Sequence, residues 1–435
     1  MAAMIFEFVN DSSPRSHKDR DPVERHLIRK KAMRAAATTK KRQAVSRSHN
    51  SSLPVSDSVT WTPIFFIHPQ ADATQYLPSS AVQKTIFAAL KGKLNAPYVK
   101  LSKLLRLCTP QLVDLLRESG GRVPYLDHAI DCLKARIRER VGTTPTEGDP
   151  MALYGRAIFS LQQALDTSDM ATTETWLATI CLTLFELLDI AGNPAWMMHA
   201  KGAFSVLQHI GPDNLVTESH KIMLAASACA IATETLHNGL PCMLDQPPWQ
   251  AAVRRTMVPN TSTFHPRGEM VNSAQLLRYK IPSIFADITN IIMRCERHGF
   301  EAVMTRTSDL CDAYKAFLEE RHERLRQPVA PEVEPYRLLT LEMTLSCAAL
   351  SMRLLSSILP QRFELETSAL LLAREALENS PPDQSSERVY HRGVASSVVI
   401  TSEIWQDSLK SSPAGATVIE SEPFRQWCNA LGRPA

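Results

Sequence analysis

The residues in this sequence most able to do chemistry are basic and lie near its beginning. Twelve lysines and arginines occur between Arg15 and Arg47, against three acidic residues. This excess of nine is larger than the net charge of +3 carried by all 435 residues, so the rest of the chain is mildly acidic. The candidate site residues are eight of these cations: Arg25, Arg29, Lys30, Lys31, Arg34, Lys40, Lys41 and Arg42.

Three interpretations fit this basic segment. It is a solvated, disordered tail, a nuclear import signal, or a surface that contacts nucleic-acid phosphates. The sequences RKK and KKR lie eight residues apart, which approximates a bipartite import signal with a slightly short spacer. Clustered cations also bind phosphates by releasing counterions. Aromatic residues do not alternate with these charges, so base stacking is not indicated and DNA contact is the least favoured interpretation.

Motifs for catalysis or metal binding are missing from the sequence. None of the thirteen histidines lies three or four residues from another, and neither GxSxG nor GxGxxG occurs. The nine cysteines are dispersed without a CxxC pair, a pattern typical of buried thiols in a reducing compartment. We therefore predict no catalytic residue, no metal site and no cofactor, and a protein that is not an enzyme.

Single reactive side chains within helical segments are better interpreted as packing residues. His199 and His209 flank an apolar face, where a partly exposed helix position explains them better than a ligand or catalytic role. Cysteine inside an apolar stripe behaves as a small hydrophobic residue. Burial is accordingly expected for Cys181, Cys229, Cys347, Trp176, Trp196 and Trp249.

Composition and periodicity indicate an all-α protein. Hydrophobic residues make up 44% and charged residues 21%, which suits a globular chain, and the 15 glycines are too few to favour nucleotide-binding α/β folds. The 28 prolines indicate many helices with sharp ends. We expect a multi-helix bundle of antiparallel helix pairs over residues 63–435, preceded by a mostly disordered basic arm and Ser-rich linker over residues 1–62.

Capping signals and apolar spacing predict the positions of the helices. In the arm, Asp21 and Pro22 begin a basic helix that runs to about Ala37, and residues 64–68 form an extended piece or short strand. Later helices are expected at Ala81–Leu94, Tyr98–Cys108, Gln111–Glu118, Pro124–Arg140, Thr217–Leu236, Pro248–Thr256, Ala274–Tyr279, Ile284–His298, Glu301–Arg326, Tyr336–Ile358, Glu364–Asn379, Pro423–Leu431 and, from context, Ser396–Asp407.

The strongest pattern is the stretch Leu153–Gly211, which predicts three consecutive amphipathic helices. Leu153, Ala157 and Leu161 recur every four residues, and comparable stripes follow Trp176 and Trp196. Gly211-Pro212 is a strong helix stop. Short connections should make these helices antiparallel neighbours.

This stretch, with LYGRAIFSLQQAL, TWLATICLTLFELL and AWMMHAKGAFSVLQHIGP, resembles the fungal-specific transcription factor regulatory domain, the helical middle homology region. LPCMLDQPPWQAA (Leu240–Ala252) and YKIPSIFADITNII (Tyr279–Ile292) look like further pieces of that domain. The FEFVNDSSP opening and the basic helix with Arg25, Arg29 and Met33 are similar to a fungal subgroup of the family. The resemblance implies an all-α nuclear protein that regulates transcription, often of metabolic or secondary-metabolite gene clusters.

One departure limits what the resemblance implies. The family's DNA-reading zinc cluster needs six closely spaced cysteines, and this chain has none before Cys108. The expected function is thus a nuclear regulator that acts through protein partners or the basic arm. The expected partners are import receptors or other regulators, with at most unspecific contact with DNA. We expect no membrane contact, and the pattern is compatible with a homodimer. The alternative is a helical protein that binds and senses a small metabolite without DNA contact.

Overall fold

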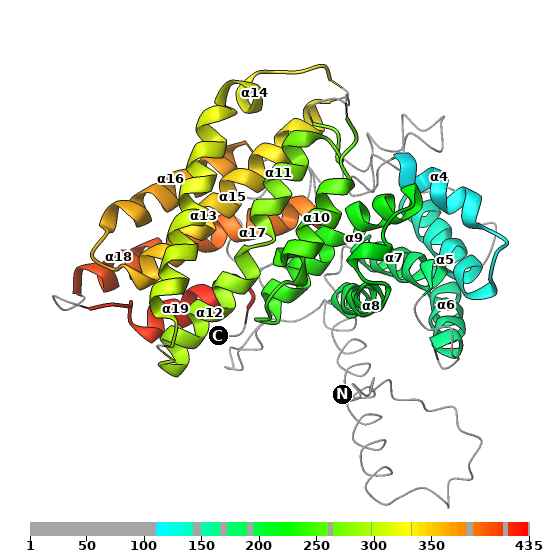
Figure 1. Ribbon diagram of the computed structural model, residues 1–435, viewed down its shortest axis with the longest axis horizontal. Helices are drawn as coiled ribbons and strands as arrows, with labels where there is room; N and C mark the ends of the chain where they lie inside the picture. Colours follow the sequence, from blue (N-terminus) through cyan, green and yellow to red (C-terminus); the bar gives the residue numbers. More distant parts are fainter. Residues whose placement is uncertain are drawn as a thin grey trace, which may run out of the picture. The chain divides into compact units, whose positions relative to one another are not determined.

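Every regular element in the described part of the chain is a helix, which confirms the predicted all-α, multi-helix fold class (Figure 1). The computed structural model describes residues 110–141, 149–165, 172–188, 195–259, 264–296, 298–331, 333–379, 386–411 and 416–433. The predictions for the basic arm and linker (1–62), the apolar piece 64–68, and helices Ala81–Leu94 and Tyr98–Cys108 lie outside these described residues.

The first group of helices contains the three predicted in Leu153–Gly211. Pro124 and Pro150 begin their helices, where the fixed φ of proline and its missing N–H cost nothing. The group comprises α4 (Pro110–Ser119), α5 (Pro124–Val141), α6 (Pro150–Leu165), α7 (Thr173–Leu187) and α8 (Ala195–Ile210). Thr172 caps α7 by accepting a hydrogen bond from the backbone N–H of Thr175 at 3.1 Å.

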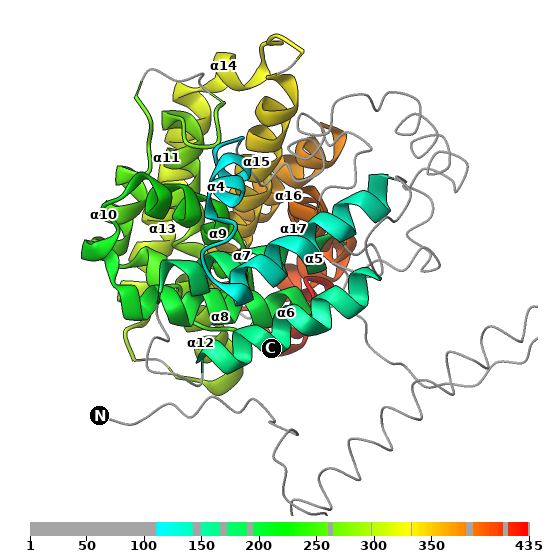
Figure 2. The same ribbon diagram turned by 90° about the vertical axis from the view of Figure 1, so that its right-hand side faces the viewer.

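Helix α7 is the centre of this first group. It contacts α5, α6, α8 and the later helix α9 (Glu218–His237), and Figure 2 shows α5 to α8 side by side. Its residues are buried almost all round, from Thr175 to Glu186. Its nearly continuous apolar sequence follows from that position, because a helix covered on every side has no solvent-facing stripe.

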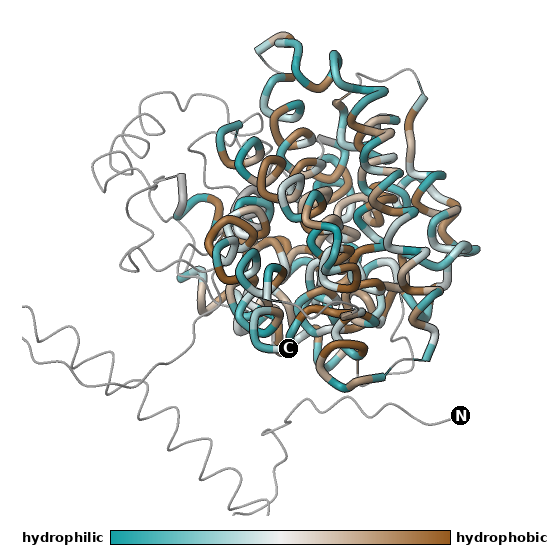
Figure 3. Tube along the Cα trace, turned by 90° about the vertical axis from the view of Figure 1, so that its left-hand side faces the viewer, coloured by the Kyte–Doolittle hydropathy of each residue, from teal (hydrophilic) through white to brown (hydrophobic). Residues whose placement is uncertain are grey.

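Two hydrophobic clusters form the interior. The N-terminal core gathers apolar residues of α4 to α9 and of α10 (Pro247–Arg255), with the 3-10 turns η3 (Pro212–Asn214) and η4 (Met243–Asp245) between these helices. The C-terminal core is built by the helices that follow. Leu236 at the end of α9 belongs to the C-terminal core, whereas Tyr279 belongs to the N-terminal core, so the two clusters are joined by crossing elements. Along most helices hydrophobic and hydrophilic positions alternate, as one-sided burial requires (Figure 3).

The second group surrounds one long central helix, α15 (Glu334–Ile358). It comprises α11 (Glu269–Arg278), α12 (Ile281–Arg294), α13 (Phe300–Glu320), α14 (His322–Arg326), α16 (Phe363–Glu378), α17 (Ser386–Ile400), α18 (Ser402–Ser411) and α19 (Ser421–Ala430). Helix α15 contacts α11, α12, α13, α14, α16 and α17. By length and composition it is the one described helix that could cross a membrane, but 89% of its apolar window is buried within the protein, as in a core helix.

Several predicted boundaries were wrong. The helix expected over Ala274–Tyr279 begins five residues earlier, at Glu269. The single helix expected over Glu301–Arg326 is broken at Arg321, whose φ of −109° and ψ of 12° separate α13 from α14. The helix expected to reach His298 ends earlier, because Cys295 adopts the left-handed conformation with φ 56°. The segment Ser396–Asp407 is helical but is divided at Thr401 into α17 and α18.

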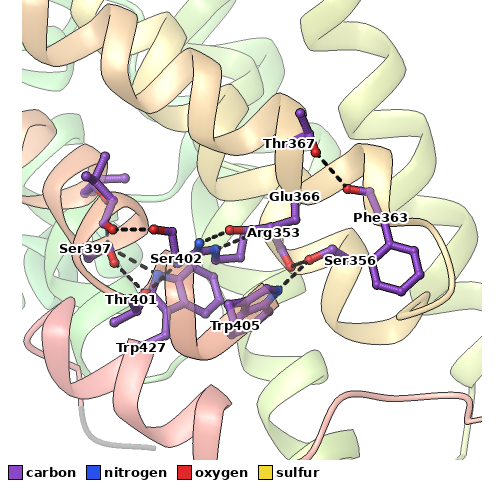
Figure 4. A network of polar contacts seen from close by, with 12 residues as sticks. Arg353, Ser356, Phe363, Glu366, Thr367, Ser397, Thr401, Ser402, Trp405 and Trp427 are labelled. Atoms are coloured by element: carbon purple, nitrogen blue, oxygen red, sulfur yellow. Dashed lines mark hydrogen bonds and ion pairs between the residues drawn. The ribbon is translucent and has the colours of Figure 1, made fainter. Parts of the chain in front are cut away.

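A buried polar network fixes the C-terminal core (Figure 4). Arg353 of α15 forms an ion pair with Glu366 of α16, and its Nη1 donates to Oγ1 of Thr401 at 2.6 Å. The guanidinium also lies 4.8 Å from the ring centroid of Trp405. Desolvation raises the pKa of the Glu366 carboxyl, and the neighbouring guanidinium opposes that shift. The network therefore links α15, α16, α18 and the break at Thr401.

Candidate functional site

The structure brings none of the eight predicted site residues together, because all of them lie outside the described residues. Those cations are Arg25, Arg29, Lys30, Lys31, Arg34, Lys40, Lys41 and Arg42. Their role in import or phosphate contact stays a prediction. Within the described ranges, no group of three His, Cys, Asp or Glu side chains is placed to hold a metal ion.

The residues interpreted as packing residues are placed as predicted, with one exception. The three tryptophans are buried, as are Cys181 and Cys347, and His209 is exposed on α8. Cys229 is only half-buried and lines a cavity, so the prediction of burial was wrong for this thiol. Its stripe on α9 faces a gap between helices and not the packed core.

His199 is half-buried and forms a hydrogen bond that the sequence did not predict. Its Nε2 lies 2.7 Å from the hydroxyl oxygen of Tyr154, which joins α8 to α6. The Tyr154 ring stacks on Phe185 of α7 with centroids 4.5 Å apart, and the guanidinium of Arg136 lies 4.4 Å from the centroid of Phe185. Tyrosine, phenylalanine and arginine thus form one stack beside the imidazole.

The imidazole of His199 and the phenol of Tyr154 are both neutral at neutral pH. Burial lowers the pKa of His199 to about 4. Burial also raises the pKa of the Tyr154 phenol, and its hydrogen bond with Glu186 raises it further. A neutral imidazole and a neutral phenol at 2.7 Å form a hydrogen bond that joins α8 to α6.

A cavity of about 60 Å³ lies between α9, α11 and α15. This is less than half of the ~150 Å³ of an apolar cavity that holds benzene, so the cavity admits only very small molecules. The walls are mostly apolar and come from all three helices and from the segment before α11: Ala225, Ala226, Phe264, Val271, Leu339 and Met343. Helices α11 and α15 contact each other, and all three helices are labelled in Figure 1.

Four uncharged polar side chains also line the cavity: Cys229, Gln275, Tyr336 and Thr340. The hydroxyl of Thr340 donates to the backbone carbonyl of Tyr336 at 2.7 Å, so its proton is used within α15. The Gln275 side chain is 9% exposed, and its Oε1 accepts no hydrogen bond from the described residues. This oxygen has almost no accessible surface, so a molecule in the cavity would not reach it.

Sequence reasoning missed Gln275 because a single glutamine within SAQLLR carries no motif. Its significance arises from burial and from the lack of a donor to Oε1 among the described residues, and both depend on how α9, α11 and α15 meet. The sequence signal that remains is a polar residue on the inward side of a short helix, which is common and uninformative.

Comparisons with known proteins give a limited picture. No protein-family model and no solved structure matches the chain. A search of curated proteins finds a similarity to an uncharacterized protein of Emericella nidulans, with 27% identity over 139 residues. The similarity covers 31% of this chain and 29% of that relative's length, so it concerns less than a third of either protein.

Proposed function

We propose that this protein is a nuclear transcriptional regulator of the fungal type, which acts through protein partners bound by its helical domain. The observation that carries the proposal is the basic segment Arg25–Arg42, with RKK and KKR eight residues apart. The resemblance of Leu153–Pro212 to the fungal regulatory domain supports it. A metabolic or secondary-metabolite gene cluster is the proposed target, and the basic arm would supply import and unspecific affinity for DNA.

Exposed apolar side chains support the role of protein partners. Met151 and Phe159 on α6 and Met198 on α8 are 52%, 50% and 66% exposed. These helices lie in the stretch that most resembles the family. Because only a contiguous exposed apolar patch marks a contact site, the proposal requires that these three side chains lie together on one surface.

Import is tested by replacing Arg29, Lys30, Lys31 and residues 40–42 with alanine in a fluorescent fusion. The expected result is movement of the fusion out of the nucleus, because import receptors recognise the clustered charge. The matched control removes six exposed cations elsewhere: Arg117, Lys134, Lys315, Arg324, Lys410 and Arg425. A nuclear signal that is the same for both variants overturns the import part of the proposal.

The regulatory part is tested by genome-wide chromatin occupancy of the tagged full chain. Sharp peaks are expected, placed by the basic arm or by a DNA-bound partner. The alanine variant is then sent to the nucleus by an added import signal. If the occupancy peaks are lost in that variant, the basic arm contacts DNA. Peaks that persist in that variant assign targeting to a partner. A flat chromatin occupancy profile for wild-type protein in the nucleus contradicts the proposed role as a transcriptional regulator.

A second candidate function is the binding of a small molecule by the helical domain, without DNA contact. The mostly apolar cavity between α9, α11 and α15 favours this function. Such a domain would act as a metabolite sensor. Ligand binding to the folded state would raise its melting temperature.

A further inference from the structure

We infer that the outer face of α6 binds the same face of a second copy of this chain, with the two α6 helices antiparallel and crossing at Gly155. This dimer rests on the proposed function in one respect, which is that the helical domain binds proteins, and it names the partner of one exposed surface. Nuclear import and contact with DNA do not depend on it.

One side of α6 is open to solvent along the whole helix. The helix packs against α5 and α7, and its buried residues are Ala157 and Leu161 on the inner side. The exposed positions fall on the opposite side and include apolar, small and charged residues: Met151, Ala152, Gly155, Arg156, Phe159 and Gln163.

Gly155 provides a point where a second helix can come close. Glycine inside a helix is less favourable than alanine, and a Cβ added at Gly155 would meet nothing within 4 Å, so packing within the chain does not require it. Met151 and Phe159 lie four residues before and after it, each about 40° around the helix axis. They are 52% and 50% exposed, so the backbone of another helix at Gly155 would lie between two large apolar side chains.

The charges on this face indicate that the second helix belongs to another copy. Asp149 and Arg156 are both exposed and seven residues apart, so they lie on the same side of the helix. A two-fold axis at Gly155 places Phe159 of one copy opposite Met151 of the other. The same axis brings each Arg156 to the side where Asp149 of the other copy lies, so two opposite-charge pairs form.

The face is small, so we expect a weak and reversible dimer. Helix α6 has 16 residues, and one helix face buries less than the ~1,600 Å² of a standard interface. The expected dissociation constant is on the order of 10 μM. Exposed ion pairs at its rim add little affinity, but they select the orientation because like charges placed opposite each other repel.

Sedimentation velocity of the full chain over a range of concentrations tests the dimer, and reversed charges test its symmetry. Arg156→Glu places acids opposite acids, and Asp149→Lys places cations opposite cations. Each variant alone should therefore dimerise at least about tenfold more weakly than wild type. An equimolar mixture of the two variants should dimerise like wild type, because both pairs then join opposite charges.

Controls separate this face from other changes. Arg425→Glu reverses an exposed cation on α19 and should leave the dissociation constant unchanged. Gly155→Glu should weaken the dimer, because two carboxylates would meet at the crossing. Circular dichroism checks that each variant is folded. If Asp149→Lys does not fold, a disulfide decides: Gly155→Cys should link two copies through position 155 on oxidation with diamide, whereas Gln208→Cys on α8 should not.

The outcomes distinguish this interface from the proposed function. Wild-type protein that remains monomeric at about ten times the expected dissociation constant overturns the dimer. Dimerisation that survives both single charge reversals, or a mixture that stays monomeric, overturns the antiparallel arrangement of α6. Import and chromatin occupancy are measured separately in cells, so a monomeric chain that still enters the nucleus and occupies chromatin removes the interface and leaves the regulator standing.

Discussion

Nε of Arg353 lies 2.9 Å from Oε2 of Glu366, and neither side chain exposes more than 1% of its surface. The pair is formed by α15 and α16, the central helix of the C-terminal core and its neighbour. Trp405 and Trp427 place their rings against the same guanidinium, at 4.8 and 5.6 Å from their centroids. The buried Arg353 guanidinium therefore connects four helices, α15, α16, α18 and α19. A buried charge is stable only where such partners surround it.

Breaking this ion pair should destabilise the protein strongly. Glu366→Gln leaves the Arg353 charge buried without its counter-charge, and we expect a loss of about 3 to 5 kcal/mol in the free energy of unfolding. Urea titration followed by tryptophan fluorescence measures it. Glu364→Gln is the control, because Glu364 pairs with Arg362 at the surface and should leave the urea midpoint unchanged. The double variant Arg353→Met/Glu366→Leu should be less destabilised than Glu366→Gln.

Gly239 should resist substitution for two separable reasons. Its φ is +65°, and a Cβ there would lie 2.9 Å from Nη2 of Arg433. That arginine donates to Oγ1 of Thr289 at 2.6 Å and stacks on Phe285, so it has little room to move. We expect Gly239→Ala to cost about 2 to 3 kcal/mol, about 1 kcal/mol of it from the backbone.

The matched control for this substitution is Gly121→Ala. Gly121 has a φ of +80°, but a Cβ added there would meet no described atom within 4 Å, so only the backbone cost of about 1 kcal/mol applies. Thermal unfolding of both variants distinguishes the two contributions. Equal losses of stability in Gly239→Ala and Gly121→Ala would show that the Arg433 side chain moves aside without a cost in free energy.

Stability should fall as the pH is lowered from about 6.5 to 4. His237 is buried with its Nδ1 donating to the carbonyl of Gly432 at 3.1 Å, and burial lowers its pKa to about 4. Between these two values the unfolded state binds a proton that the folded state does not, so each step down in pH favours unfolding. For this histidine we expect a contribution of about 2 to 3 kcal/mol over the window.

His199 adds to the same pH dependence, since burial also holds its pKa at about 4. Urea midpoints measured between neutral and mildly acidic pH test both residues. His237→Gln should flatten the curve relative to wild type, whereas replacing the exposed His209 with glutamine should not. A curve for His237→Gln that runs parallel to wild type would contradict the assigned proton uptake.

Tyr154 and His199 should be energetically coupled. Tyr154→Phe keeps the stacking on Phe185 and removes the hydroxyl that lies 2.7 Å from Nε2 of His199. We expect a loss of about 1 kcal/mol from the hydrogen bond to His199, and a further loss because the hydroxyl also bonds Glu186. A double-mutant cycle with His199→Phe should give a coupling energy of similar size. Additive losses would mean that the hydrogen bond contributes nothing.

Local signals in the sequence predicted most of the helices in the described part of the chain. Gly211, expected as a stop, ends α8 with a φ of +78°, and Pro124 and Pro150 stand at the first positions of α5 and α6. Capping and proline act over a few residues, so the sequence contains all the information needed to place them. The breaks at Arg321 and Thr401 were missed because nothing local requires them.

At Thr401 the side chain accepts from Arg353 and donates to the carbonyl of Ser397 at 2.7 Å, so a partner 48 residues away contributes to the end of a helix. The same holds for the candidate cavity. The sequence places Gln275, Cys229 and Met343 on three separate helices, and gives no sign that they share one wall.

The sequence by itself determined the all-α class, the amphipathic faces and many helix ends, since periodicity and capping are properties of neighbouring residues. Only the tertiary structure decided which polar groups are buried with partners and which are not. The charge of Arg353 is balanced by Glu366, whereas Oε1 of Gln275 is buried without a donor from the described residues. The physical reason is that desolvation depends on every helix packed around a group, and three helices meet at Gln275 only after the chain has folded.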